Sequence, residues 1–302
     1  MKNQNRLLIC LLTGFLALFP SSLFAQSYSI TLVASFDYPG AGNSTTPFGI
    51  NRGGDIAGYF LNSSGATRGF IRFRDGSFSA PLVEPSDTGN FTRGAGINSV
   101  QTVVGDFFNV GDNSFHGYFL SGGVFTQFDF GGPFSTNVTG INDAGDFVGT
   151  FGNVTQPNQG FVNVGGTSTV ITIPGATLSF AYGINNLDRA VGTYTDSASI
   201  VHGFLRDSSG ALTAPLDFPG STSTEFLGIN DRGWIVGRYQ VGDGLIHGLF
   251  LKLPNTFVSF DFPGAVETSL NGINNAGLIS GRYTDGAGIR HGFVARVRRT
   301  AN

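Results

Sequence analysis

The stretch Gly-Ile-Asn-Asn-Ala-Gly-Leu-Ile-Ser-Gly-Arg-Tyr at residues 272–283 contains the pattern that decides the fold. Its opening tripeptide, Gly-Ile-Asn, occurs six times, and the steps between successive copies are 47, 44, 43, 45 and 44 residues. The copies begin at Gly49, Gly96, Gly140, Gly183, Gly228 and Gly272. Self-similarity at a fixed period of this length is typical of proteins built from repeated structural units.

Two further features recur at matching positions in all six copies. A hydroxyl residue lies four positions before each tripeptide, at Thr45, Thr92, Thr136, Ser179, Thr224 and Thr268. After each tripeptide comes a glycine followed two residues later by an aromatic residue, as in Gly58/Phe60 and Gly281/Tyr283. Short runs rich in Ile, Val, Phe and Tyr alternate with Gly, Asn, Asp and Ser clusters, which predicts four short strands in each copy and no helices.

Four antiparallel strands every 40 to 50 residues predict an all-β fold, a six-bladed β-propeller. A solenoid is the alternative, but it would need atypical capping repeats at its ends. One strand, at residues 30–37, precedes the first copy, and only three strands follow the last tripeptide. We therefore expect the N-terminal strand to join the last blade and close the ring, which removes an open sheet edge. The predicted propeller domain covers residues 26–299, followed by a tail at 300–302.

The N-terminus has the pattern of a secretory signal peptide. Lys2 and Arg6 precede an apolar run at residues 7–19, and small residues follow up to Ala25, which predicts a signal peptide at residues 1–25. The apolar run is shorter than a helix that crosses the ~30 Å hydrocarbon core of a membrane. The prediction is a secreted protein, extracellular or periplasmic, with no membrane span after cleavage. Cys10 is the only cysteine, so the mature chain has no thiol or disulfide.

The charge pattern argues against nucleic acid as a partner. Charged residues make up 12% of the chain, against about 25% in a typical soluble domain. The formal net charge is -3, and the chain has no cluster of Lys and Arg able to neutralise several phosphates. The only dense basic run, Arg296, Arg298 and Arg299, is expected to form a frayed, solvated tail. No cofactor is predicted.

All four histidines occupy one position of the repeat, directly before the glycine of the third strand. They are His116, His202, His247 and His291. The following strand carries an aspartate in the same blades, namely Asp129, Asp217 and Asp261, with Asp37 of the N-terminal strand as the partner of His291. The two copies without the histidine, which have Arg68 and Gln159 there, also lack the aspartate. We therefore predict four structural His–Asp pairs, each a buried charge-assisted hydrogen bond.

The repetition of the histidines excludes two other roles. Equivalent positions on different blades lie on sheets packed about 10 Å apart, so four histidines cannot converge on one metal ion. A catalytic histidine of a Ser-His-Asp triad is a single residue and not a member of a repeated set. The sequence thus predicts neither a metal site nor a catalytic residue.

The repeats resemble the HAF repeats of bacterial extracellular proteins. The resemblance rests on Asp-Phe-Pro-Gly at residues 217–220 and 261–264, Gly-Ile-Asn-Asn-x-Gly at 272–277, and His-Gly-Phe at 202–204 and 291–293. It covers about residues 28–297 and departs from the pattern at Arg68, Gln159 and Leu249. The resemblance implies secretion and repetition, and it implies no particular biochemical activity.

Residues that differ between the copies are the candidates for function, since the invariant ones build the framework. The six asparagines of the Gly-Ile-Asn tripeptides are expected to cap hairpins, and the strand glycines to let the ring of a neighbouring blade pack against the backbone. The residue after each invariant hydroxyl varies. Together with three nearby charged residues, these positions form the candidate ligand-binding set Thr46, Arg93, Asn137, Phe180, Glu225, Ser269, Arg238, Arg282 and Glu267. We expect them to surround one mouth of the central channel, where aromatic and polar groups together suit a sugar.

Three functions remain open at this point. The leading hypothesis is a secreted, non-enzymatic binding or scaffold module that recognises a glycan or a protein through one face. The alternative is a polysaccharide hydrolase or lyase, which would need two carboxylates about 5 to 9 Å apart, with Glu225 and Glu267 as the candidate pair. The third is a purely structural extracellular repeat protein with no pocket.

Overall fold

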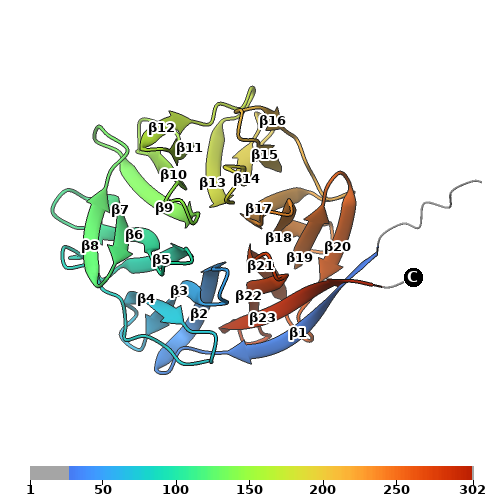
Figure 1. Cartoon of the computed structure of the whole chain (residues 1–302), viewed down its shortest axis with the longest axis horizontal. Helices are drawn as coiled ribbons and strands as arrows, with labels where there is room; N and C mark the ends of the chain where they lie inside the picture. Colours follow the sequence, from blue (N-terminus) through green and yellow to red (C-terminus); the bar gives the residue numbers. More distant parts are fainter. Residues whose placement is uncertain (1–26, 301–302) are drawn as a thin grey trace, which may run out of the picture.

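The computed structural model describes residues 27–300, so the predicted signal peptide and residues 301–302 lie outside the described part. These residues form 23 strands arranged as six blades around a central channel (Figure 1). The prediction of an all-β, six-bladed propeller is therefore confirmed. Within residues 27–300 no helix is long and apolar enough to cross a membrane.

Each blade is an antiparallel sheet whose first strand lines the channel and whose last strand lies at the rim. The first blade contains β2 (Ala41–Ile50), β3 (Ile56–Asn62) and β4 (Thr67–Arg72). The second contains β5 (Thr92–Ile97), β6 (Val103–Asn109), β7 (Ser114–Ser121) and β8 (Val124–Phe128). The third contains β9 (Ser135–Ile141), β10 (Phe147–Gly152), β11 (Gln159–Val164) and β12 (Thr167–Val170).

The remaining three blades follow the same order. The fourth contains β13 (Leu178–Ile184), β14 (Ala190–Thr195), β15 (Val201–Arg206) and β16 (Leu212–Thr213). The fifth contains β17 (Ser223–Ile229), β18 (Trp234–Gln240), β19 (Ile246–Lys252) and β20 (Thr256–Phe260). The sixth contains β21 (Glu267–Ile273), β22 (Leu278–Thr284), β23 (Arg290–Arg299) and, from the other end of the chain, β1 (Tyr28–Phe36).

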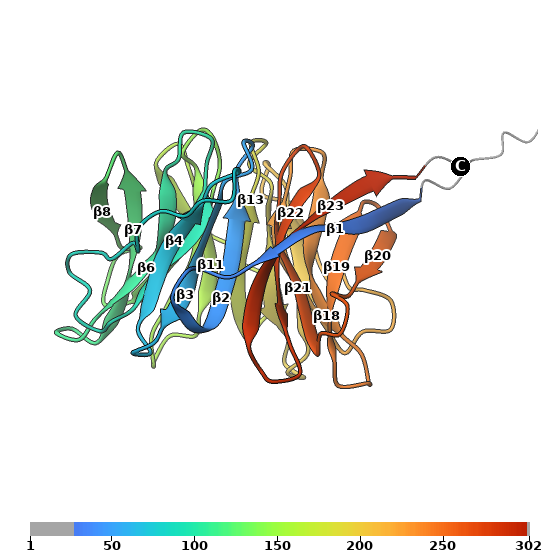
Figure 2. The same cartoon turned by 90° about the horizontal axis from the view of Figure 1, so that it is seen from below.

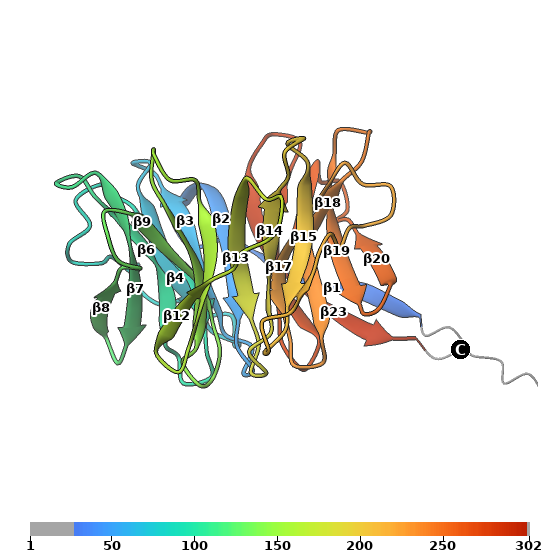
Figure 3. The same cartoon turned by 90° about the horizontal axis from the view of Figure 1, so that it is seen from above.

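The N-terminal strand closes the ring, as predicted. Strand β1 pairs antiparallel with β23 in a register that runs from Tyr28 opposite Arg299 to Phe36 opposite Gly292. Figures 2 and 3 show these two strands extending together past the body of the ring. The prediction of a frayed basic tail is wrong, because Arg296, Arg298 and Arg299 belong to this ladder.

The outer edge of the first blade is the least regular part of the ring. It is held by two isolated bridges, Gly69 to Leu82 and Arg72 to Phe78, and not by a continuous strand. Pro81 has no N–H to give to a ladder. Ser79 compensates in part, since its hydroxyl accepts a hydrogen bond from the Ile71 N–H at 3.0 Å.

The apolar core lies between the blades. At four of the six junctions, an aromatic residue near the outer strand of one blade stacks on an aromatic residue of the next. Between the fourth and fifth blades, the ring of Phe218 stacks on Tyr239 with centroids 3.7 Å apart. The N–H of Phe218 donates to the hydroxyl of Thr224 at 3.0 Å. The same stacking occurs in the pairs Tyr38–Phe60, Phe130–Phe151 and Phe262–Tyr283. The invariant hydroxyls therefore join each blade to the one before it, and the Gly-x-aromatic motifs do so at four junctions.

The six Gly-Ile-Asn asparagines form a closed ring of hydrogen bonds around the channel. Each side-chain oxygen caps its own hairpin, as predicted, and each side-chain amide also donates to the backbone carbonyl of the asparagine in the next blade. The amide–carbonyl pairs are Asn51 to Asn98, Asn98 to Asn142, Asn142 to Asn185, Asn185 to Asn230, Asn230 to Asn274, and Asn274 to Asn51. The last of these pairs joins the sixth blade to the first.

The structure corrects the role expected for the glycines of the Gly-x-aromatic motif. A Cβ at Gly281 would lie 2.7 Å from the carbonyl oxygen of Ser269, which belongs to the same blade. It would also collide with the ring of Phe293 on the third strand of that blade. These glycines therefore make room for a β-bulge and a ring within their own sheet, and not for a ring of the neighbouring blade.

Candidate functional site

A ring of six isoleucines divides the central channel into two cavities. The isoleucines are Ile50, Ile97, Ile141, Ile184, Ile229 and Ile273, each at most 9% exposed. On one side of the ring is a cavity of about 240 Å³, and on the side of the asparagines a smaller one of about 70 Å³. All six isoleucines line both cavities. The larger one, called the mouth cavity here, is therefore bordered at its base by apolar side chains.

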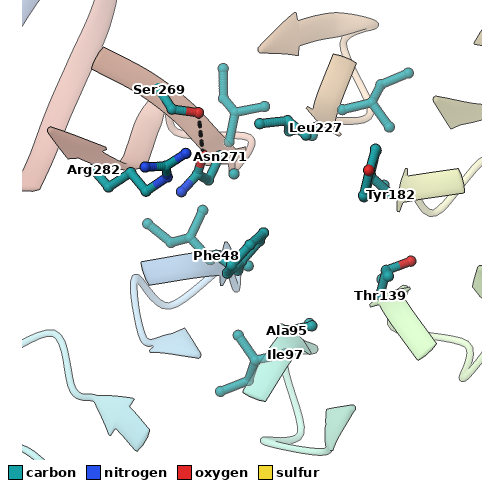
Figure 4. A pocket seen from close by; sticks show the side chains of 18 of the residues that line it. Phe48, Ala95, Ile97, Thr139, Tyr182, Leu227, Ser269, Asn271 and Arg282 are labelled. Atoms are coloured by element: carbon teal, nitrogen blue, oxygen red, sulfur yellow. Dashed lines mark hydrogen bonds between the residues drawn. The ribbon is translucent and has the colours of Figure 1, made fainter. Parts of the chain in front are cut away.

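The inner strands build the walls of the mouth cavity with alternate residues, because successive side chains of a strand point to opposite faces. Figure 4 shows one such layer around the cavity, formed by the residue directly before each Gly-Ile-Asn. Its members are Phe48, Ala95, Thr139, Tyr182, Leu227 and Asn271. This layer was not predicted from the sequence. Two signals could have found it: these residues differ between copies, and each lies two positions after the predicted variable residue.

The structure brings together five of the nine predicted ligand-binding residues at the mouth cavity. They are Arg93, Glu225, Ser269, Arg238 and Arg282. Asn137, Phe180 and Glu267 are not among the lining residues. Thr46 is also outside the lining; its residue is 1% exposed, and its hydroxyl lies 3.4 Å from that of Ser44. Tyr59 and Arg290, which were not predicted from the sequence, line the cavity as well.

Most charges at the cavity are paired with each other. Arg93 and Asp106 stand opposite each other on β5 and β6, and two guanidinium nitrogens of Arg93 lie 2.9 and 2.6 Å from one Asp106 oxygen. Arg238 and Glu225 likewise face each other on β18 and β17 and form two hydrogen bonds of 2.8 Å. Burial raises the pKa of the Asp106 carboxyl above its usual value, despite the neighbouring Arg93.

Glu267 links two arginines of neighbouring blades. One of its oxygens lies 2.7 Å from a terminal nitrogen of Arg282 and 3.5 Å from one of Arg238. Burial opposes ionisation of Glu267, but the charge and hydrogen bond of Arg282 outweigh it and hold the pKa of Glu267 below its usual value. The pKa of Arg282 is lowered by burial, and the charges of Arg238 and Arg290 add to the effect. The site therefore combines the ionised carboxylate of Glu267 with closely spaced cations.

Each histidine lies within hydrogen-bond distance of the aspartate that the repeat pattern assigns to it. The Nδ1 atoms are 2.9 Å from Asp129 (His116), 2.7 Å from Asp217 (His202), 2.9 Å from Asp261 (His247) and 2.9 Å from Asp37 (His291). The expectation that these pairs are buried needs correction, because the side chains of the four aspartates are 30–51% exposed. The pairs sit at the rim of the blades, where water reaches the carboxylates.

A second aspartate on the loop before the third strand contacts the other nitrogen of each histidine. The Nε2 atom of His247 is 3.0 Å from Asp243, and that of His202 is 3.4 Å from Asp196. Asp112 and Asp285 play the same part for His116 and His291. The sequence carries a signal for this contact, since each histidine follows an aspartate by four or six residues. Among residues 27–300 no group of three His, Cys, Asp or Glu side chains is placed to hold a metal ion.

These features define a six-bladed β-propeller with an asymmetric cavity at one end of its channel. Solved structures of lectins share this architecture. The Aleuria aurantia lectin, a fungal lectin with a six-bladed β-propeller fold and a fucose recognition mode, is 11% identical, with a TM-score of 0.50 over 90% of this chain and 92% of the lectin. A mutant of the same lectin in complex with Fucα1-6GlcNAc is 13% identical, with a TM-score of 0.55 over 86% of this chain and 95% of the lectin.

Two further structures are similar in fold. AofleA from Arthrobotrys oligospora is 9% identical, with a TM-score of 0.56 over 92% of this chain and 90% of AofleA. TolB from Acinetobacter baumannii is 12% identical, with a TM-score of 0.54 over 81% of this chain and 65% of TolB. No family model and no curated protein sequence matches the chain, so the resemblance to HAF repeats has no family assignment behind it. At these identities the likeness concerns the fold alone.

Proposed function

We propose that this protein is a secreted, non-enzymatic carbohydrate-binding module that holds part of a glycan in the mouth cavity. The observation that carries the proposal is a cavity at one end of the channel, lined both by aromatic rings (Phe48, Tyr59, Tyr182) and by polar groups such as Ser269 and Asn271. Aromatic faces pack against the apolar faces of sugar rings, and amide, hydroxyl and guanidinium groups bond sugar hydroxyls.

The dimensions and the fold support this assignment. A volume of about 240 Å³ lies just below the ~300–1,000 Å³ of pockets for drug-sized ligands, so we expect one sugar unit in the cavity and the rest of the glycan outside it. Fucose-binding propeller lectins provide a precedent for sugar recognition on this fold.

The geometry favours binding over hydrolysis or elimination. A glycosidase of the common type needs a protonated carboxylic acid as well as a second carboxylate. Among the described residues that line the cavity, Glu225 is the only carboxylate, and both of its oxygens accept hydrogen bonds from Arg238. Glu267 has a lowered pKa, the opposite of what a general acid requires. The cavity itself also argues against a purely structural repeat.

A cavity-filling variant tests the proposal without disturbing an ion pair. Ala95→Phe places a ring in the wall layer of the cavity, and Val154→Phe adds the same bulk at a fully exposed position. On a glycan array, we expect the wild-type protein and Val154→Phe to bind the same glycans and Ala95→Phe to lose them while keeping its thermal unfolding midpoint. Binding that survives in a folded Ala95→Phe protein would place the glycan elsewhere, and the absence of any glycan binding would refute the proposal.

A further inference from the structure

The mouth cavity carries an excess of positive charge on the side of the sixth blade. Three arginines, Arg238, Arg282 and Arg290, face only two glutamates, Glu225 and Glu267. Arg290 lines the cavity, and within residues 27–300 its side chain forms no ion pair or hydrogen bond. The two glutamates are already engaged by Arg238 and Arg282, so one positive charge at the cavity has no partner.

Arg282 adds a donor that also lacks a partner. The residue is 8% exposed, and its Nη2 atom is 2.7 Å from Glu267, but its Nη1 atom is buried without a hydrogen-bond acceptor. Figure 4 shows this side chain reaching into the cavity wall beside Asn271. A buried donor without an acceptor is costly, and a charged one more so. Because Arg282 lines the cavity, an anion bound there would interact with a guanidinium charge that Glu267 compensates through only one nitrogen.

The two unsatisfied arginines lie on one face of the same blade. In the antiparallel pair β22–β23, Arg282 stands opposite Gly292, and Arg290 precedes Gly292 by two residues. Residues two apart on a strand point to the same face, so Arg282 and Arg290 are diagonal neighbours. Two guanidinium groups in this relation match the oxygens of a carboxylate or sulfate group.

We propose that the sugar bound in the mouth cavity is acidic, with its carboxylate or sulfate group between Arg282 and Arg290. This inference rests on the proposed function and narrows it to one class of ligand, glycans that contain uronic acid or sulfated units. In that arrangement the anionic group meets the sixth blade, and the sugar ring lies between Phe48 and Tyr182, which face the cavity from opposite sides.

Calorimetric titration of the full chain with matched sugars tests the inference. Methyl β-glucuronide and glucose 6-sulfate are compared with methyl β-glucoside, and acetate serves as an anion without a sugar. We expect at least one acidic sugar to bind about tenfold or more tightly than the neutral one, since hydrogen bonds to charged groups are the stronger kind. Added salt should reduce that difference, because it screens partly exposed charges.

Two variants locate the anionic group. Arg290→Gln removes a cation that has no ion pair, so we expect a folded protein that binds acidic and neutral sugars alike. Arg282→Gln should have the same effect, with unfolding midpoints measured because Glu267 then loses a partner. Arg74→Gln is the matched control, since Arg74 is exposed and lies outside the cavity lining.

The outcomes separate this inference from the proposed function. Neutral sugars that bind as well as acidic ones would overturn the acidic assignment and leave carbohydrate binding intact. An acidic preference that persists in folded Arg290→Gln and Arg282→Gln proteins would overturn the placement between these arginines. Acetate binding as tightly as the acidic sugars would reduce the site to a simple anion site, and binding of no glycan on the array would remove the proposed function as well.

Discussion

Each asparagine of the Gly-Ile-Asn motif caps its own hairpin and also bonds the next blade, so its removal should lose both sets of hydrogen bonds. In Asn230, the oxygen accepts N–H bonds from Arg232 and Trp234, and the amide donates to the carbonyl of Asn274 at 3.0 Å. The residue is 4% exposed, so water cannot replace these partners. We expect Asn230→Ala to lower the free energy of unfolding by about 1–3 kcal/mol, the range for leaving buried polar groups unsatisfied.

Urea denaturation followed by tryptophan fluorescence measures the change, since Trp234 follows directly on the hairpin. Asn43→Ala is the control, because Asn43 is exposed. An unfolding free energy of Asn230→Ala within error of the control would show that the asparagine ring contributes nothing to stability.

The histidines with two aspartate neighbours should make the stability of the ring depend on pH. Burial disfavours the charged form of His202, but hydrogen bonds to Asp217 and Asp196 outweigh it and raise the pKa of His202. The same balance raises the pKa of His247 and His291. A raised pKa in the folded protein contributes stability that is complete below the unfolded value near 6.5 and is lost as the pH rises through the folded value.

The aspartates on the loops set the lower limit of the pH range in which the folded protein is most stable. Hydrogen bonds from backbone N–H groups lower the pKa of Asp196, Asp243 and Asp285, and those to the histidines add to the effect. Their contribution is present above the unfolded value near 4 and is lost as the pH falls through the lower folded values.

We therefore expect the urea midpoint to rise from pH 8 to pH 6 and to fall again below pH 4. His202→Gln imitates the third blade, which has Gln159 at this position, and should reduce the rise between pH 8 and pH 6. A midpoint that is flat or decreases from pH 8 to pH 6 in the wild-type protein would contradict this account.

Among the strands, the inner ones are packed at the limit that backbone atoms allow. A Cβ added at Gly228 would lie 2.9 Å from the carbonyl oxygen of Asn271 and 3.0 Å from the Cα of Gly272 on the next inner strand. The obstacle is backbone, which cannot rotate away as a side chain does. We expect Gly228→Ala to destabilise the protein by about 1–3 kcal/mol, as overpacking of a tight core does.

Thermal unfolding with Gly242→Ala as the control measures this effect, since a Cβ at Gly242 meets no atom within 4 Å. If Gly228→Ala were as stable as the control, the inner strands would have to move apart, and the close approach would not be a constraint of the fold.

The strands and their closure could be predicted from the sequence because the repeat shows each position six times. Gly-Ile-Asn, the invariant hydroxyl and the His–Asp correlation all reflect contacts that occur in several copies. The candidate site was only partly predictable for the same reason. The wall layer that includes Phe48 and Tyr182 varies between copies. The buried nitrogen of Arg282 lacks a partner because Glu267 bonds another nitrogen of Arg282 and is shared with Arg238 of the fifth blade. Such details follow from the packing of two blades, which no single repeat encodes.

In the whole molecule, the two ends of the described residues 27–300 lie in one blade, and this arrangement replaces a covalent link between the first and last repeats. The backbone N–H of Thr300 donates to the carbonyl of Ser27 at 3.0 Å, and the two residues directly after β1 supply Asp37 for His291 and Tyr38 for the stack on Phe60. These contacts hold the sixth blade against the first, although no single segment of backbone runs from the end of the last repeat to the start of the first.

Two circular permutants can separate the effect of this shared blade from that of the cut itself. Both join residue 300 to residue 27 through a short linker, which the adjacent ends allow. One opens the chain between Pro254 and Asn255, in the β19–β20 hairpin, so that β20 becomes a new N-terminal strand that completes the fifth blade. The other opens it between Gly264 and Ala265, so that every blade is continuous and no strand joins the two ends.

We expect the first permutant to unfold in one transition near the parent midpoint. The second should unfold at lower urea, because only side-chain packing and isolated hydrogen bonds then hold the fifth blade against the sixth. The two cuts are ten residues apart and both fall outside strands, so equal midpoints would show that a blade shared by both ends is not what keeps the ring closed.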